Sequence, residues 1–140
     1  MQSLAIVVAF LFTDLSLATN PAKADWYCRN PQIEIQCSKA SCVAQNPEEI
    51  TIMDVLFNLE GEFSICAYTG CWNGVTEVVE NGEFVTLTKH NVEWTSLTTN
   101  NSMASDILIA FHRTDNVAMV KFAGWAHPFN CEPWTTKDDT

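Results

Sequence analysis

Six cysteines constrain the fold of this 140-residue chain more than any other feature. They are Cys28, Cys37, Cys42, Cys66, Cys71 and Cys131. An even number of cysteines in a short exported chain is typical of a disulfide framework, although sequence alone leaves several connectivities open. Spacing favours one of them. Cys37 with Cys42, and Cys66 with Cys71, each flank a four-residue segment suited to a hairpin, and Cys28 with Cys131 would then join the two ends of the domain.

The first residues predict an export signal. An apolar run from Leu4 to Phe12 is followed by Ala22-Lys23-Ala24, which is the A-x-A pattern that a signal peptidase cuts. Asp14 interrupts the run well before the roughly 20 apolar residues that a membrane-spanning helix needs. We therefore expect residues 1–24 to be a cleaved signal peptide, with cleavage after Ala18 as the alternative. The mature chain would then be periplasmic or secreted and would have no membrane span.

Length and charge limit what the mature chain can be. Residues 25–140 have about the commonest length of a single domain, so we expect one domain. The chain has 7 Lys and Arg against 17 Asp and Glu, a formal net charge of −10. This charge argues against nucleic acids and anionic lipids as partners, because clustered Lys and Arg bind those polyanions. An acidic surface serves solubility or steers a cationic partner toward the protein.

Apolar residues beyond residue 30 recur at every second position, which is the period of a β-strand. The segments that carry this pattern, or that are rich in β-branched and aromatic residues, are 33–37, 53–59, 63–67, 107–112 and 117–122. Asn81-Gly82 is the strongest turn signal. The β-prone runs 75–80 and 83–88 on either side of it predict two adjacent antiparallel strands.

About eight short strands at regular spacing predict a mainly β, disulfide-stapled antiparallel meander. Because nearly every connection is a local hairpin, a closed or partly closed barrel is favoured, with a two-sheet β-sandwich as the alternative. The polar segment Thr95 to Ser105 is the one long loop that we expect. Helix is expected only at Glu48-Glu49 or around Ser102 to Ser105.

The sequence contains no motif that indicates catalysis or metal binding. His90, His112 and His127 are too far apart for a recognised zinc spacing. No nucleophile elbow or metalloprotease motif is present. The adjacent carboxylates Glu48 and Glu49 would point to opposite sides of an extended backbone. We therefore predict no catalytic residue, no metal and no cofactor, and the enzyme class, as a small hydrolase, ranks last.

Aromatic residues are the features most suggestive of binding. Segment 124–129 combines a glycine, two aromatic residues, a histidine and a proline, a composition common in loops that contact ligands or partners. Packing just before Cys131 explains the segment equally well. A second candidate lies beside Cys71. The candidate binding residues are Trp72, Asn73, Trp125, His127 and Phe129.

These features predict a small acidic binding module of the bacterial envelope, which engages a cationic protein or a small ligand through loops at one end of the sheet. A structural or stress-related periplasmic protein without a discrete ligand is the alternative. The outline, an exported acidic β-domain with a cysteine near each end, is similar to that of the periplasmic inhibitors of lysozyme, small β-barrels that act on a cationic enzyme. Their Ser-Gly-x-x-Tyr and Lys-Gly segments are absent from the chain, so the resemblance implies no site residues.

Overall fold

The computed structural model describes residues 24–30, 32–96, 98 and 103–134. The predicted signal peptide therefore lies outside the described residues, except for Ala24. Within the described part of the chain, no helix is long and apolar enough to cross a membrane.

The described residues form an all-β fold with a single 3-10 turn, η1 (Pro47–Glu49), at one of the two places where helix was expected. The strands are β1 (Trp26–Arg29), β2 (Ile35–Cys37), β3 (Cys42–Ala44), β4 (Met53–Phe57), β5 (Glu62–Ala67), β6 (Gly70–Val75), β7 (Val78–Asn81), β8 (Phe84–Ser96), β9 (Met103–His112), β10 (Val117–Phe122) and β11 (Trp125–Pro133).

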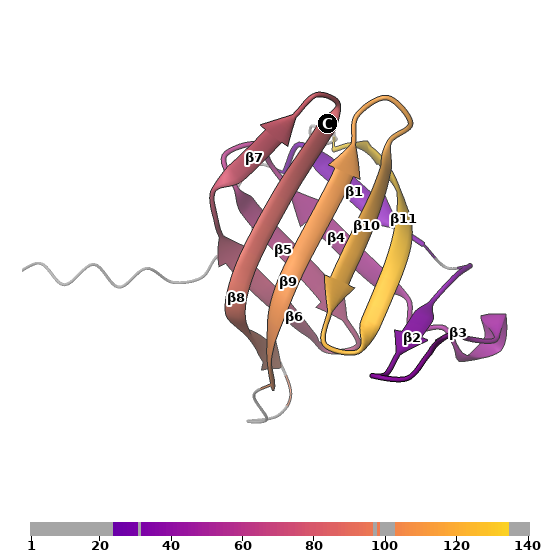
Figure 1. The fold of residues 1–140 in the computed structure, drawn as a ribbon. Helices are drawn as coiled ribbons and strands as arrows, with labels where there is room; N and C mark the ends of the chain where they lie inside the picture. Colours follow the sequence, from indigo (N-terminus) through magenta and orange to yellow (C-terminus); the bar gives the residue numbers. More distant parts are fainter. Residues whose placement is uncertain (1–23, 31, 97, 99–102, 135–140) are drawn as a thin grey trace, which may run out of the picture.

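Eight of the strands form a closed antiparallel barrel (Figure 1). They pair in the order β1-β4-β5-β6-β8-β9-β10-β11, and β11 pairs back with β1. The predicted barrel is therefore confirmed, and the sandwich alternative is wrong. Closure leaves these strands without an open sheet edge.

Three additional strands lie outside the barrel. β7 pairs with the first half of β8, while β6 pairs with its second half, so β6 and β7 follow one another along one side of β8. The β2–β3 hairpin pairs with the first two residues of β11 and lies beside the barrel in Figure 1.

The barrel interior is filled with side chains, because alternate residues of each strand point inward. Met53, Val55 and Phe57 are buried along β4, and Ile107, Ile109 and Phe111 are buried along β9. These rows belong to one continuous apolar core that includes side chains from every barrel strand. The apolar residues that recur at every second position of the sequence thus form the inward face of the barrel.

The three disulfides have the connectivity that spacing favoured: Cys28–Cys131, Cys37–Cys42 and Cys66–Cys71. In each case the two cysteines are directly opposite each other in adjacent antiparallel strands. Cα–Cα separations of 4.0 to 4.1 Å accompany this register. Hairpin geometry therefore selects the partners of both short-range pairs.

Segment 124–129, which was expected to be a loop, lies almost entirely in strand β11. Pro128 is compatible with the strand because its carbonyl points away from β10 and accepts a hydrogen bond from the Asn30 side chain. The nitrogen and the carbonyl of a strand residue point to the same side, so the position of the missing N–H of Pro128 also faces away from β10. On that side, β11 pairs with β2 at Trp125 and Ala126 and with β1 from Asn130 onward, and Pro128 lies between these two stretches. The proline therefore removes no ladder hydrogen bond.

Two boundaries also differ from those expected. The tight turn after β7 has Gly82 and Glu83 as its central residues, because Asn81 already pairs with Phe84. The strands around the polar segment extend into it, since β8 continues to Ser96 and β9 begins at Met103. Cross-strand pairs such as Trp94 with Met103 prolong the two strands beyond what the polar residues suggested.

Candidate functional site

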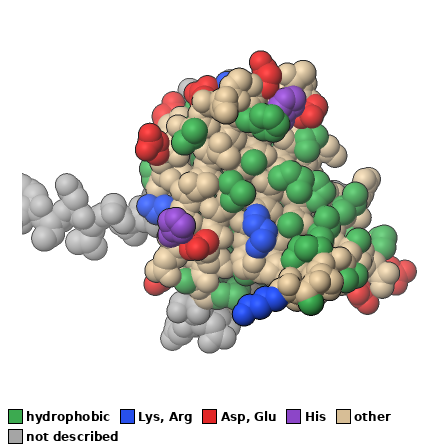
Figure 2. Space-filling view, viewed as in Figure 1, with side chains coloured by type: hydrophobic (Ala, Val, Ile, Leu, Met, Phe, Trp, Pro, Cys, Tyr) green, Lys and Arg blue, Asp and Glu red, His purple; other side chains and the backbone are tan. Residues whose placement is uncertain are grey.

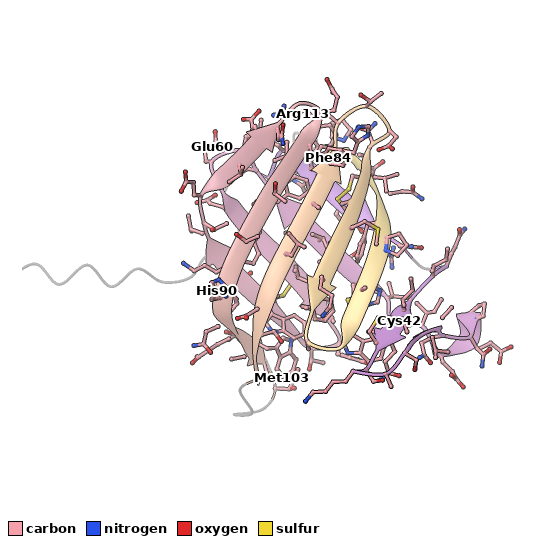
Figure 3. The ribbon with its side chains drawn as sticks, viewed as in Figure 1. Cys42, Glu60, Phe84, His90, Met103 and Arg113 are labelled. Carbon is pink, nitrogen blue, oxygen red and sulfur yellow. A yellow bond between two sulfur atoms is a disulfide. The ribbon has the colours of Figure 1, made fainter. Side chains whose placement is uncertain are left out.

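One end of the barrel contains a cavity of about 160 Å³. It lies where β8 ends and β9 begins, the end marked by Met103 in Figure 3, whereas Glu60, Phe84 and Arg113 mark the opposite end. The lining residues are Thr51, Met53, Ala67, Tyr68, Trp72, Trp94, Met103, Phe122, Ala123 and Trp125. Most of them are apolar, and none of these described lining residues is charged.

Small residues near the β5–β6 turn leave room for the aromatic rings of the cavity. Ala67 pairs with Gly70 across this turn, and Tyr68 adopts a left-handed conformation with φ of 56°. The ring of Trp94 lies against Gly70, since a Cβ at Gly70 would be 2.3 Å from Cε2 of that ring. A larger residue at this position would therefore displace one wall of the cavity.

Pairing between β6 and β8 brings two tryptophans together. Trp72 is directly opposite Trp94 in the register, and their ring centroids are 6.2 Å apart. Trp72 also contacts Phe122, with a centroid distance of 5.1 Å. The cavity walls are thus aromatic rings contributed by strands that are distant in sequence.

Hydrogen bonds fix the polar side of the site. The hydroxyls of Thr51 and Tyr68 are 2.8 Å apart, and both groups are at the surface. The backbone N–H of Thr51 donates to the carboxylate of Glu34, at 2.8 Å, and Glu34 is only 1% exposed. This contact joins the segment before the β2–β3 hairpin to the segment before β4, so it helps to position the cavity wall.

Three of the five buried polar side-chain atoms that make no hydrogen bond in the described residues belong to residues in or beside the cavity. The other two are Asn73 Oδ1 and His112 Nδ1, the latter 3.1 Å from the Asp115 carboxylate. Within the described residues, the indole nitrogens of Trp72 and Trp94 and the Nε2 atom of His127 are buried and make no hydrogen bond. His127 lies in the core beside the cavity, stacked on Phe122 at a centroid distance of 5.7 Å. Burial lowers the pKa of His127 to about 4, so its imidazole is neutral at ordinary pH.

The five candidate binding residues from the sequence occupy three different places. Trp72 and Trp125 line the cavity. His127 and Phe129 are core residues, each only 1% exposed, and their rings are 5.8 Å apart. Asn73 is half-buried on the outer face of β6, because it follows the inward-pointing Trp72.

Several cavity residues were not among those candidates. Met53, Met103, Trp94 and Phe122 come from four strands, and only strand pairing brings them to one end of the barrel. Their inward direction could be read from alternation in the sequence. Their common location could not, because it depends on the register of non-neighbouring segments.

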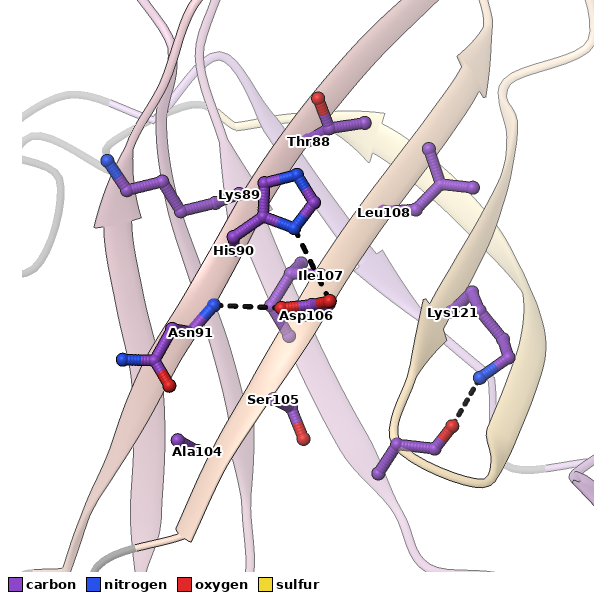
Figure 4. A pocket seen from close by; sticks show the side chains of 11 residues that line it. Thr88, Lys89, His90, Asn91, Ala104, Ser105, Asp106, Ile107, Leu108 and Lys121 are labelled. Atoms are coloured by element: carbon purple, nitrogen blue, oxygen red, sulfur yellow. Dashed lines mark hydrogen bonds and ion pairs between the residues drawn. The ribbon is translucent and has the colours of Figure 1, made fainter.

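A second concavity lies on the outer wall, over the ends of β8 and β9 that approach the cavity (Figure 4). At a β-bulge in β8, His90 Nδ1 is 3.3 Å from Asp106 Oδ2, and the backbone N–H of Asn91 donates to Asp106 Oδ1 at 2.9 Å. The Asn91 amide, and secondarily His90, hold the pKa of Asp106 below its usual value. The neighbouring Ser105 is buried and pairs with Val92.

The other two histidines contact different parts of the fold, and His127 is the core residue described above. His112 is near the opposite end of the barrel, with Nδ1 3.1 Å from Asp115 Oδ1 and its ring against Phe84. No group of three or more metal-ligating side chains occurs among the described residues.

Charge is distributed unevenly over the surface. In Figure 2, acidic side chains border the upper end, beside the turns that follow β7 and β9, whereas mostly apolar side chains cover the wall over β9, β10 and β11. Glu80 lies at the acidic end, where it pairs with Arg113 at 2.5 Å. The cavity is therefore at the end of the barrel remote from these acidic turns.

The fold and the cavity define a small antiparallel β-barrel with an aromatic-lined recess at one end. No family model, no curated protein and no solved structure matches the chain. The functional argument consequently rests on the residues of the site.

Proposed function

We propose that this protein is a non-enzymatic binding barrel that holds a small, largely apolar organic molecule in the cavity at the Met103 end. The observation that carries the proposal is the partly enclosed, aromatic-lined cavity of about 160 Å³. Binding sites for small molecules are typically concave and apolar with a few fixed polar groups, and barrel mouths are common places for them.

Cavity size limits the ligand. An engineered protein cavity of about 150 Å³ binds benzene, so a molecule with one aromatic ring is the appropriate scale here. Flat walls made by Trp72, Trp94 and Phe122 suit a flat molecule, which can contact several rings at once. The uncharged lining favours a neutral molecule, because a buried charge without a partner is costly.

The small ligand ranks ahead of a cationic protein partner. The cavity is a defined site, whereas the acidic side chains in Figure 2 are spread over several parts of the surface. We also propose that the protein functions in an oxidising compartment, as the periplasm or the cell exterior would be. Three disulfides support this, since such bonds persist mainly there.

Methionine methyl groups provide a direct test. Met53, which is buried, and Met103, which is 51% exposed, line the cavity, whereas Met119 lies on the outer wall and is not among the lining residues. In oxidised protein with ¹³C-labelled methionine methyls, titration with α-methylstyrene should shift the Met53 and Met103 signals saturably and leave Met119 unchanged. Unchanged cavity signals, or equal shifts at all three methionines, would contradict the proposal.

A further inference from the structure

The two tryptophans that face each other across β6 and β8 have indole N–H groups without acceptors. In the part of the chain that the structure describes, both nitrogens are buried and neither makes a hydrogen bond. Trp72 is only 4% exposed, and Trp94 is half-buried. Both residues line the cavity. The two residues that carry the unpartnered donors are therefore also part of the apolar wall.

An indole N–H can only donate. Burying it without an acceptor costs free energy, because the hydrogen bond to water in the unfolded chain is not replaced. Most buried polar groups in folded proteins do have partners, so two unpartnered donors on residues that line one cavity require an explanation. A bound molecule with an acceptor atom would supply the missing partner for one or both indoles.

The acceptor should be neutral. None of the described residues that line the cavity is charged, so a carboxylate or phosphate placed there would lose its hydration without gaining a cationic partner. The chain as a whole is also strongly acidic, which disfavours an anionic ligand. A carbonyl oxygen on a planar molecule satisfies both the donors and the walls.

We infer that the cavity selects neutral, planar molecules with one hydrogen-bond acceptor, of the aryl ketone or aryl amide class, and that Trp72 and Trp94 are the donors that determine this specificity. The inference rests on the proposed function. It adds that binding depends on the chemistry of the ligand's polar atom as well as on its shape.

Three probes of nearly the same shape distinguish the proposed function, which is binding of a small apolar molecule, from the further inference, which is selection for a neutral hydrogen-bond acceptor. Acetophenone has a neutral carbonyl, α-methylstyrene replaces that oxygen by a methylene group, and benzoate has a carboxylate. Each is titrated into oxidised wild-type protein, and the methionine methyls report binding. Acetophenone should bind about tenfold more tightly than α-methylstyrene, the ratio that one net hydrogen bond provides. Benzoate should bind most weakly.

Tryptophan-to-phenylalanine variants identify the donors. Trp72→Phe and Trp94→Phe keep an aromatic ring and remove the N–H group. At least one of them should reduce the preference for acetophenone to about one, while α-methylstyrene affinity changes little. Trp134→Phe is the control, because Trp134 packs against Tyr27 and is absent from the cavity lining. This control should retain the full preference.

The wild-type indole resonances give a second measurement in case a variant does not fold. Acetophenone should move the N–H proton of Trp72 or Trp94 downfield, as a new hydrogen bond does, and α-methylstyrene should not. Equal affinities for these two probes, or a preference that survives both substitutions, would overturn the inference and leave the proposed function intact. Tightest binding of benzoate would overturn the requirement for a neutral acceptor. Binding of none of the probes would overturn the proposed function, and the inference with it.

Discussion

Cys28 lies directly opposite Cys131 in the pairing of β1 with β11, and the disulfide between them spans the seam at which the barrel closes. Their sequence separation is 103 residues, whereas the other two disulfides each join residues five apart. The seam joins the first and last strands of the barrel, so its closure is the longest-range event in the fold. The disulfide and the β1–β11 ladder stabilise the same contact.

Removal of the seam disulfide should destabilise the protein most. On the chain-entropy model, Cys28→Ala with Cys131→Ala should lower the free energy of unfolding by about 4 to 5 kcal/mol, and Cys37→Ala with Cys42→Ala by roughly 2 kcal/mol. Urea unfolding of the two double variants, followed by circular dichroism, measures the difference. Equal losses would show that loop length does not determine the stabilisation.

Two glycines in turns should respond differently to the same substitution. Gly61 has φ of 95°, and a Cβ there would lie 1.8 Å from the carbonyl oxygen of Thr76. Gly82 has φ of 61° and open space around it. Gly61→Ala should therefore cost about 3 kcal/mol or more, because strain and a backbone clash add, while Gly82→Ala should cost only about 1 kcal/mol.

Gly82→Asn serves as the control for conformational strain, because asparagine tolerates the left-handed region, and it should be close to neutral. Thermal and urea unfolding of the three variants provide the comparison. A Gly61→Ala protein as stable as Gly82→Ala would mean that the β4–β5 turn can move away from Thr76.

His127 should contribute to acid destabilisation. Burial lowers its pKa to about 4 in the folded protein, compared with 6.5 ordinarily. As pH falls below 6.5, the unfolded chain takes up a proton that the folded protein takes up only near pH 4, so stability is lost across this window. The loss attributable to this group should reach about 3 kcal/mol, and above pH 6.5 it should vanish.

The variant His127→Phe isolates this effect, because it keeps an aromatic ring next to Phe122 and has no titratable group. Carboxylates that titrate in the same range are common to both proteins and cancel in the difference. The free energy of unfolding of the variant, measured relative to wild type in urea, should rise as pH falls from neutral to about 4. Parallel pH profiles would contradict the assignment.

Filling the cavity should weaken binding without unfolding the barrel. Ala67 lines the cavity and is 3% exposed, so Ala67→Leu places additional carbon atoms in the space that a ligand would occupy. We expect the affinity for α-methylstyrene to fall by about tenfold or more, since the leucine displaces roughly one ring's volume.

Ala110→Leu makes the same chemical change on the outer wall, opposite Met119, and should leave the affinity unchanged. The methionine methyl titration described above measures both variants. Retention of binding by Ala67→Leu, with the cavity methyl signals still shifting, would place the ligand elsewhere on the barrel.

The sequence by itself indicated the class of fold and favoured the disulfide pairing that the structure has. Period-two alternation depends on local residue order, so segments such as 53–57 and 107–111 could be assigned to buried strand faces without knowledge of their partners. Cys37 with Cys42 and Cys66 with Cys71 could be paired for the same reason, since a hairpin brings neighbours in sequence together. The composition of segment 124–129 misled this local reading, because Pro128 lies in β11 at a point where its missing N–H faces neither β2 nor β1.

Only the tertiary structure decided where the site is. Trp72 and Trp125 were candidates from the sequence and Trp94 was not, and the meeting of all three at one end of the barrel depends on the register of β6 with β8 and on closure of the sheet. His127 and Phe129 share a strand face with Trp125 yet lie deeper in the core. Depth along a barrel is a property of strand stagger, which local residue patterns do not encode, whereas the inward or outward direction of a side chain is a property of local alternation.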